Sequence, residues 1–201
     1  TGPNAATEVP AARASVDFGR LVSVKMTIGI DPNGPTNGIT VVGNVTLRFR
    51  SDRRWIDVKQ FTFVDDTSEV DLLARLTAHR QFKDGYIGSG PGDAAIHGPY
   101  RLEAVTPDRY EPLDAATAIE WLDGFCALFD VFPPRCLAED IDSVVRGRMR
   151  QAATLFRLRV PDDAQHECGW ILDEFRELVV IRRERRELLL VVMTSLQRKK
   201  S

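Results

Sequence analysis

Alternating apolar and polar residues mark two strands near the start of the chain. From Val22 to Ile30 every second residue is apolar, and the alternation resumes from Ile39 to Phe49. A period of two places one face of a strand against a core. The segment between them, DPNGPTNG, supplies the Pro, Asn and Gly that turns use. The pattern therefore predicts two long antiparallel strands joined as a hairpin.

Three further segments are rich in β-branched and aromatic residues, which favour strands. WIDVKQFTFV, residues 55–64, predicts a third strand, and its apolar positions change parity between Val58 and Phe61, which we interpret as a bulge. YRLEAVT, residues 100–106, predicts a short strand, and TLFRLRV, residues 154–160, predicts another.

Residues 175–196 contain two apolar runs around a charged turn at 182–187. One continuous helix is an alternative, because Arg, Glu and Leu are good helix formers. We favour a hairpin, because the run from Leu188 to Met193 is apolar on both faces, as in a central strand covered on both sides.

Helical spacing of apolar residues appears in three segments. Ser68 begins a capping pattern that predicts a helix over residues 69 to about 82, and Asp114 is a suitable N-cap for a second helix. Pro134 suits the first turn of a third. Together the elements predict an α+β fold, an antiparallel or mixed β-sheet with two to three helices packed on it. We expect the first strands to form a meander and the C-terminal pair to extend the same sheet.

The domain organisation follows from the same patterns. We expect residues 1–15 to be a flexible N-terminal tail, residues 16–197 a single α+β domain, and residues 198–201 a basic C-terminal tail. The net charge of −2 makes nucleic-acid binding unlikely, and no apolar run approaches the length of about 20 residues that spans a bilayer. Three widely spaced cysteines argue against a disulfide framework and favour a cytoplasmic location, although their roles stay open: Cys126, Cys136 and Cys168.

The stretch DGYIGSGPGDAAIHGPY, residues 84–100, contains five glycines and two prolines. Its residues 90–95 match G-x-G-x-x-A, but a dinucleotide site needs a strand before the first glycine and a helix after the second. Neither is predicted, so we expect a surface loop of about 17 residues without secondary structure. A loop of that length is unusual, which leaves a lid or partner-binding role open.

No sequence motif assigns catalytic, cofactor or metal residues. The spacing of His166 and Cys168 does not match a zinc site, and Cys126 lies on the apolar face of a predicted helix, as a core thiol would. A site assembled by the fold remains possible in principle near the glycine-rich stretch, beside Trp170 or Tyr100. Its weak catalytic candidates are His97, Asp93 and Ser89.

Arginines cluster at 146–150 and at 182–186, and the chain ends with a further basic group. They could form one positive patch, but the interleaved Glu184 and Glu187 favour a solvated hairpin tip. The absence of a convergent motif leads us to predict a non-enzymatic protein-interaction or accessory protein of immunity type, bacterial and soluble, with a protein partner or homo-oligomer. The alternative is a small-molecule-binding protein or enzyme with a site near residues 84–100. The sequence does not decide whether the chain is an enzyme, and it identifies neither partner nor substrate nor oligomeric state.

Overall fold

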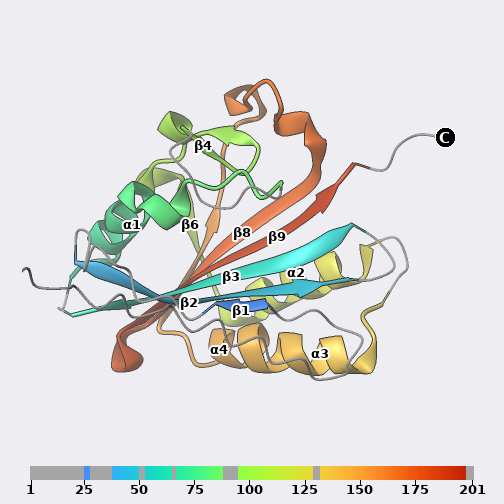
Figure 1. Cartoon of the computed structure of the whole chain (residues 1–201). Coiled ribbons are helices and arrows are strands. Elements are labelled where there is room, and N and C mark those ends of the chain that lie inside the picture. Colours follow the sequence, from blue (N-terminus) through green and yellow to red (C-terminus); the bar gives the residue numbers. More distant parts are fainter. Residues whose placement is uncertain are drawn as a thin grey trace, which may run out of the picture.

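The computed structural model describes residues 25–27, 38–49, 53–64, 67–87, 95–128 and 132–197. The two predicted tails and most of the first predicted strand lie outside these ranges. The described residues form an antiparallel sheet with helices on both faces (Figure 1). The predicted α+β class is therefore confirmed.

Within the described ranges the main sheet has seven strands in the order β1-β2-β3-β9-β8-β7-β6, and every neighbouring pair is antiparallel. The predicted meander and the C-terminal extension of the same sheet are confirmed, with β3 and β9 pairing at the centre. The strands are β1 (Lys25–Thr27), β2 (Ile39–Arg48), β3 (Arg54–Phe63), β6 (Tyr110–Leu113), β7 (Thr154–Leu158), β8 (Leu172–Arg182) and β9 (Glu187–Leu196).

A second, two-stranded sheet lies within and just after the glycine-rich stretch. It consists of β4 (Ile96–His97) and β5 (Tyr100–Arg101), and the chain then forms a 3₁₀ turn at Leu102–Ala104. Two predictions are corrected here. The stretch 84–100 does contain secondary structure, and the predicted strand 100–106 ends after two residues.

The helices begin where the capping residues predict. The Oγ atom of Ser68 accepts a hydrogen bond from the amide of Asp71 at 3.2 Å, and Asp114 accepts from the amide of Thr117 at 2.9 Å. These caps satisfy amides that the first helical turn leaves without a partner. The helices are α1 (Glu69–Ala78) with a 3₁₀ turn (Arg80–Phe82), α2 (Ala115–Cys126), α3 (Arg135–Ile141), a π-helical turn (Asp142–Arg146) and α4 (Gly147–Met149).

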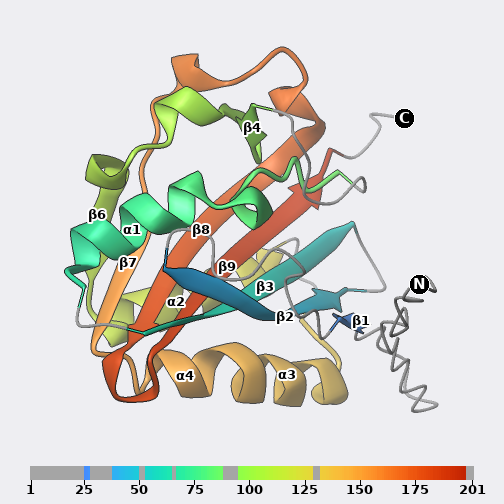
Figure 2. The ribbon, with the colours of Figure 1, turned by 60° about the vertical axis from the view of Figure 1, so that its left-hand side comes forward.

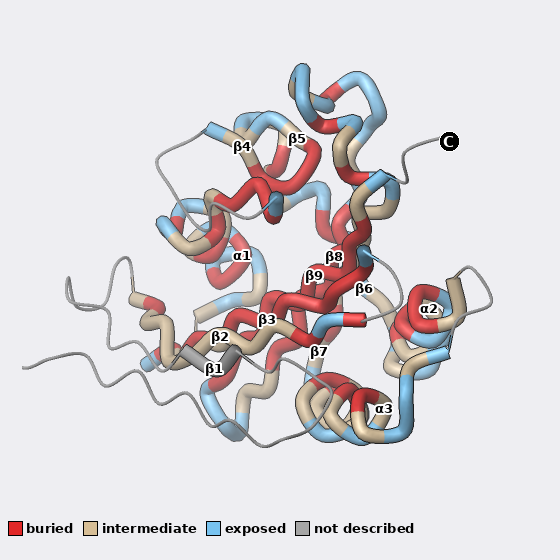
Figure 3. The backbone as a smooth tube through the Cα atoms, turned by 45° about the vertical axis from the view of Figure 1, so that its right-hand side comes forward, coloured by how far each residue is buried: buried red, intermediate tan, exposed pale blue. Residues whose placement is uncertain are grey.

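Helix α1 covers one face of the sheet, and α2, α3 and α4 cover the other (Figure 2). Each face has its own apolar core. Strand β9 contributes to both, since Leu188, Leu190 and Val192 pack beneath α1 while Leu189, Val191 and Met193 pack beneath the other helices. The predicted hairpin, rather than a helix, is confirmed, and its central strand is buried on both sides (Figure 3).

The bulge lies in β2 and not, as predicted, in β3. Val41 pairs with Phe61 but Gly43 pairs with Gln60, so Val42 is the extra residue. Before this bulge the odd-numbered residues of β2 pack beneath α1, and after it they pack beneath α2 and α3. The residues of β3 pair consecutively with both neighbouring strands, so β3 is regular. Its change of parity has another cause: both faces of β3 are buried, so apolar residues fit at even and at odd positions.

Candidate functional site

Two charged side chains of β3 lie inside the core beneath α1. The regular alternation of β3 puts Asp57 and Lys59 on the same face as Trp55, Phe61 and Phe63, which belong to that core. Lys59 is 1% exposed and Asp57 is 6% exposed. Charges buried to this extent need partners, because burial removes their hydration.

Lys59 is the centre of the first half of a buried polar network. Its Nζ donates to the Asp84 carboxylate at 2.7 Å, to the carbonyl oxygen of Gln81 at 2.7 Å and to the Tyr86 hydroxyl at 3.3 Å. Asp84 also accepts from the backbone amide of Tyr86 at 2.8 Å. Tyr86 has a φ of 55°, which is uncommon for a bulky residue, so this contact is made at a cost in backbone strain.

The second half of the network is built around His97. Its Nδ1 lies 2.6 Å from the carbonyl oxygen of Phe82, its Nε2 contacts the Glu177 carboxylate, and its ring stacks on Phe82 with centroids 3.6 Å apart. Glu177 also accepts from the Tyr110 hydroxyl at 2.6 Å. A carbonyl can only accept, so Nδ1 carries a proton, and the contact between Nε2 and the carboxylate requires a second proton between them.

The pair of His97 and Glu177 has the chemistry to transfer a proton, but solvent does not reach it. The side chains of His97 and Glu177 are both 0% exposed. Burial, and then the nearby Glu177 carboxylate, raise the pKa of Tyr110 well above its ordinary value of 10.0, and burial followed by the carboxylates of Asp57 and Asp84 does the same for Tyr86. Both tyrosine hydroxyls therefore remain protonated at neutral pH.

The structure describes only one of the three catalytic candidates that the sequence suggested. His97 lies in the buried network, while Ser89 and Asp93 fall outside the described residues. Of the predicted neighbours, Tyr100 packs against the Phe175 ring with centroids 5.8 Å apart, and Trp170 is 60% exposed. The role of these residues in catalysis stays a prediction.

The cysteines and the metal-binding side chains give no second site within the described residues. Burial raises the pKa of Cys126 to about 11, with the Arg146 guanidinium opposing the shift, so this thiol is protonated and packs as a core residue. Cys136 is partly buried and Cys168 is exposed, and both are free thiols. The described ranges contain no cluster of three or more His, Cys, Asp or Glu side chains arranged to hold a metal ion.

We expect the substitution Asp57→Asn to stabilise the protein at neutral pH. One carboxylate oxygen accepts from Thr46 at 2.9 Å, but the other, Oδ2, is buried without a partner in the described structure. Burial raises the pKa of Asp57 above 3.8 despite the opposing Lys59, so the folded state holds this proton more tightly than the unfolded state. Ionised Asp57 thus destabilises the fold above its raised pKa. Asn should increase the free energy of unfolding by roughly 1 kcal/mol at pH 7.

Urea unfolding across pH tests this expectation. The gain should shrink as the pH falls through the raised pKa and vanish below 3.8, where Asp57 is protonated in both states. The matched control is Asp173→Asn at an exposed position of β8, which should show no such pH-dependent gain. A loss of stability for Asp57→Asn at pH 7 would contradict the assignment.

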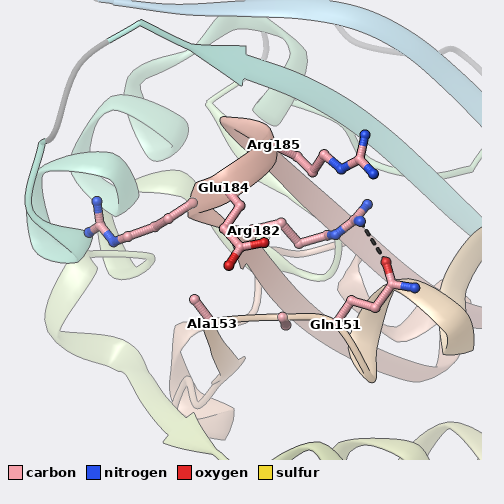
Figure 4. Close-up of a pocket in the computed structure, with 7 residues that line it drawn as sticks. Gln151, Ala153, Arg182, Glu184 and Arg185 are labelled. Atoms are coloured by element: carbon pink, nitrogen blue, oxygen red, sulfur yellow. Dashed lines mark hydrogen bonds between the residues drawn. The ribbon is translucent and has the colours of Figure 1, made fainter.

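A different kind of site lies at the tip of the β8–β9 hairpin, at the other end of the sheet from β4 (Figures 1 and 2). A surface cavity of about 310 Å³ is lined there by Gln151, Ala152, Ala153, Arg182, Arg183, Glu184 and Arg185. Arg182 and Arg185 extend the same way across the close-up, and Arg182 hydrogen bonds Gln151 at 2.6 Å (Figure 4). None of these described lining residues is aromatic.

Two of the four arginines at the hairpin tip have acidic partners. Arg182 pairs with Glu187 at 2.6 Å, and Arg183 pairs with Glu69 at 3.2 Å. The arginines of the 146–150 group are neutralised too, through Asp123, Asp142 and Glu187. In the described part of the chain, the side chains of Arg185 and Arg186 have no ion pair or hydrogen bond, and both are exposed.

None of the helices in the described ranges has the length and apolar character needed to cross a membrane. No protein-family model and no curated protein matches this sequence. Among solved structures, the chain shows distant similarity to the crystal structure of citrus MAF1, with a TM-score of 0.39 and 8% sequence identity over 76% of this chain and 93% of that chain.

Proposed function

We propose that the protein is a non-enzymatic protein-binding domain, of an accessory or immunity type, that contacts its partner through the tip of the β8–β9 hairpin. The observation that carries this proposal is the tip surface, defined here as Val64, Val70, Arg183, Arg185 and Arg186. It combines the exposed Arg185 and Arg186 and the half-buried Arg183 with large apolar side chains, since Val64 is 72% and Val70 is 66% exposed. Interfaces between proteins are enriched in arginine and contain apolar residues at their centre.

The members of the tip surface are held together by the fold. The amide of Phe63 donates to the carbonyl oxygen of Arg186 at 3.1 Å, which places the adjoining Val64 beside the hairpin turn. Arg183 donates to the carbonyl oxygen of Thr67 at 3.0 Å and pairs with Glu69, next to Val70. These contacts bring three chain segments together at the hairpin tip.

A partner that is a protein fits this surface better than a nucleic acid. Single-stranded nucleic acids are usually held by aromatic side chains that stack on bases, and the cavity lining has none in the described structure. Glu184 also lines the cavity, and the net charge of the chain is −2, so the basic excess that nucleic-acid binding requires is missing.

An enzymatic function is the alternative, and the contact between His97 and Glu177 is the observation in its favour. This histidine has the carboxylate partner that an acid–base residue often uses. Catalysis would require the pair to reach solvent, although both side chains are fully buried. Rapid modification of His97 by diethyl pyrocarbonate in the folded protein, at the rate of the less buried His166, would favour this alternative.

Site-specific photocrosslinking tests the proposed function. We expect a photoreactive phenylalanine analogue at position 64 or 70 to give a discrete covalent adduct with one other protein in cells of the native host. The matched control is the same analogue at Phe132, which is 73% exposed but lies between α2 and α3. The absence of an adduct at both tip positions, or an equal adduct from position 132, would contradict the assignment of the tip surface.

A further inference from the structure

We infer that the tip surface binds an acidic segment of the partner, and that Arg185 and Arg186 receive its carboxylates. This inference rests on the proposed function and specifies the chemistry of the partner. It concerns the four arginines and two glutamates of residues 182–187. Their roles differ, because two of the arginines serve the fold and two are left for a ligand.

Arg182 and Arg183 are committed to contacts within the chain. Arg182 bridges Glu187 and Gln151, both at 2.6 Å, and Arg183 joins the hairpin to the start of α1 through Glu69. Glu187 is itself 6% exposed and also accepts from Gln60 at 2.7 Å, so its charge faces inward. These pairs fix the turn and leave little net charge of their own.

Arg185 and Arg186 extend from this fixed turn without an acidic partner in the described structure. Arginine presents a rigid fork of N–H donors that matches a carboxylate in a bidentate contact. Two guanidinium groups on consecutive residues, without an ion pair among the described residues, outnumber the single exposed carboxylate of Glu184 in the same turn. The complementary partner carries two or more carboxylates in one short segment.

The backbone of Arg186 supports a functional rather than a structural role for its side chain. Its φ is 49°, in the left-handed region where glycine or asparagine costs least. Its side chain makes no ion pair or hydrogen bond within the described structure, although its backbone amide bonds to the carbonyl oxygen of Arg183 and its carbonyl oxygen accepts from the amide of Phe63. Strain of this kind often occurs where a side chain contacts a ligand.

The surroundings favour an acidic peptide over a free anion such as phosphate. A cavity of about 310 Å³ has room for a whole acidic side chain together with the backbone that carries it. Val64 and Val70 belong to the tip surface, though not to the cavity lining, and they offer apolar contacts that an inorganic anion cannot use.

Fluorescence polarisation with a defined probe tests the inference. The probe is a labelled, N-acetylated peptide with four glutamates around a central leucine and valine, titrated with the full chain at low ionic strength. We expect Arg185→Glu to weaken its binding at least tenfold, because a charge-assisted contact is lost and a repulsion is added. The matched control is Arg135→Glu, which changes an arginine whose side chain is 94% exposed on α3 and should alter the affinity less than twofold.

Each outcome bears on the inference. Binding that disappears when glutamine replaces every glutamate of the probe supports it, as does loss of affinity with rising salt. It is overturned if the glutamine peptide binds equally, if no binding occurs at millimolar concentrations, if Arg135→Glu has the larger effect, or if single-stranded DNA of equal charge or inorganic phosphate competes as well as the acidic peptide. If crosslinking at the tip succeeds while these tests fail, the protein-binding function stands and only the acidic partner is wrong.

Discussion

Replacing Lys59 by methionine is expected to lower the free energy of unfolding by about 3–5 kcal/mol, the usual cost of leaving a buried charge without its partner. Methionine has a similar length and fills the space of the lysine stem, so a cavity would contribute little to the loss. The loss comes instead from two buried carboxylates: Asp84 keeps its amide contact with Tyr86 but no longer has the ammonium group at 2.7 Å, and Asp57 loses the positive charge that lowers its pKa. Urea unfolding monitored by circular dichroism measures it.

A second substitution separates this explanation from a packing defect. In the double variant Lys59→Met with Asp84→Asn the buried carboxylate is gone, so a large part of the lost stability should return. The single variant should also recover partly at acidic pH, because Lys59 lowers the pKa of Asp57 and its removal lets that carboxyl take up a proton more readily. If the double variant is less stable than the single one, charge pairing is not the cause.

Replacing Gly98 by alanine is expected to cost roughly 3 kcal/mol, combining about 1–2 kcal/mol for a left-handed backbone with about 1–3 kcal/mol for overpacking. Gly98 has a φ of 53°, and with Pro99 it forms the two-residue turn between His97 and Tyr100. A Cβ atom there would overlap the ring of Phe175. The turn and the burial of His97 would both be disturbed.

The control for Gly98→Ala is Gly85→Ala in the same glycine-rich stretch. Gly85 is not in the left-handed region, and its Cβ would approach the flexible end of Ile96 at 3.1 Å, so we expect a loss below about 1 kcal/mol. Thermal unfolding of both variants gives the comparison. Equal losses would show that the turn at Gly98 is not the constrained element of this stretch.

The sequence was sufficient to predict those helices and strands that are determined by a few neighbouring residues. Ser68 and Asp114 marked the starts of α1 and α2, because a capping side chain acts only on amides two or three residues ahead. The hairpin of β8 and β9 was predictable because its apolar residues occupy both parities, as a strand between two covered faces requires.

The same two-sided burial hid the bulge. A sheet with one covered face shows a bulge as a break in alternation, but here each face has a core. The apolar residues on either side of Val42 both fall at odd positions, although they pack in different cores, so the parity of the apolar positions does not reveal the bulge. In β3 the prediction failed in the opposite way. The apolar residues change from even to odd positions, which suggested a bulge, but the strand is regular.

The candidate site was predictable only in part. His97 was a candidate from its place in the glycine-rich stretch, but its partner Glu177 lies 80 residues away along the chain. One signal could have found that partner, because Glu177 has the same parity in β8 as Phe175 and Val179 and therefore faces the core beneath α1. The site at the hairpin tip was not predictable, because the ion pairs of Arg182 and Arg183 decide which arginines are available to a ligand. The spacing of residues in the sequence does not show these pairs.

The central pairing of β3 with β9 sets an order on how the chain can fold during synthesis. Strands β1 to β3 can form early as a meander, but the inner edge of β3 keeps unpaired amides and carbonyls until β9, far later in the chain, leaves the ribosome. Such an edge is a template for pairing with other chains. The interval between the two strands is therefore the period in which the nascent protein is most exposed to aggregation.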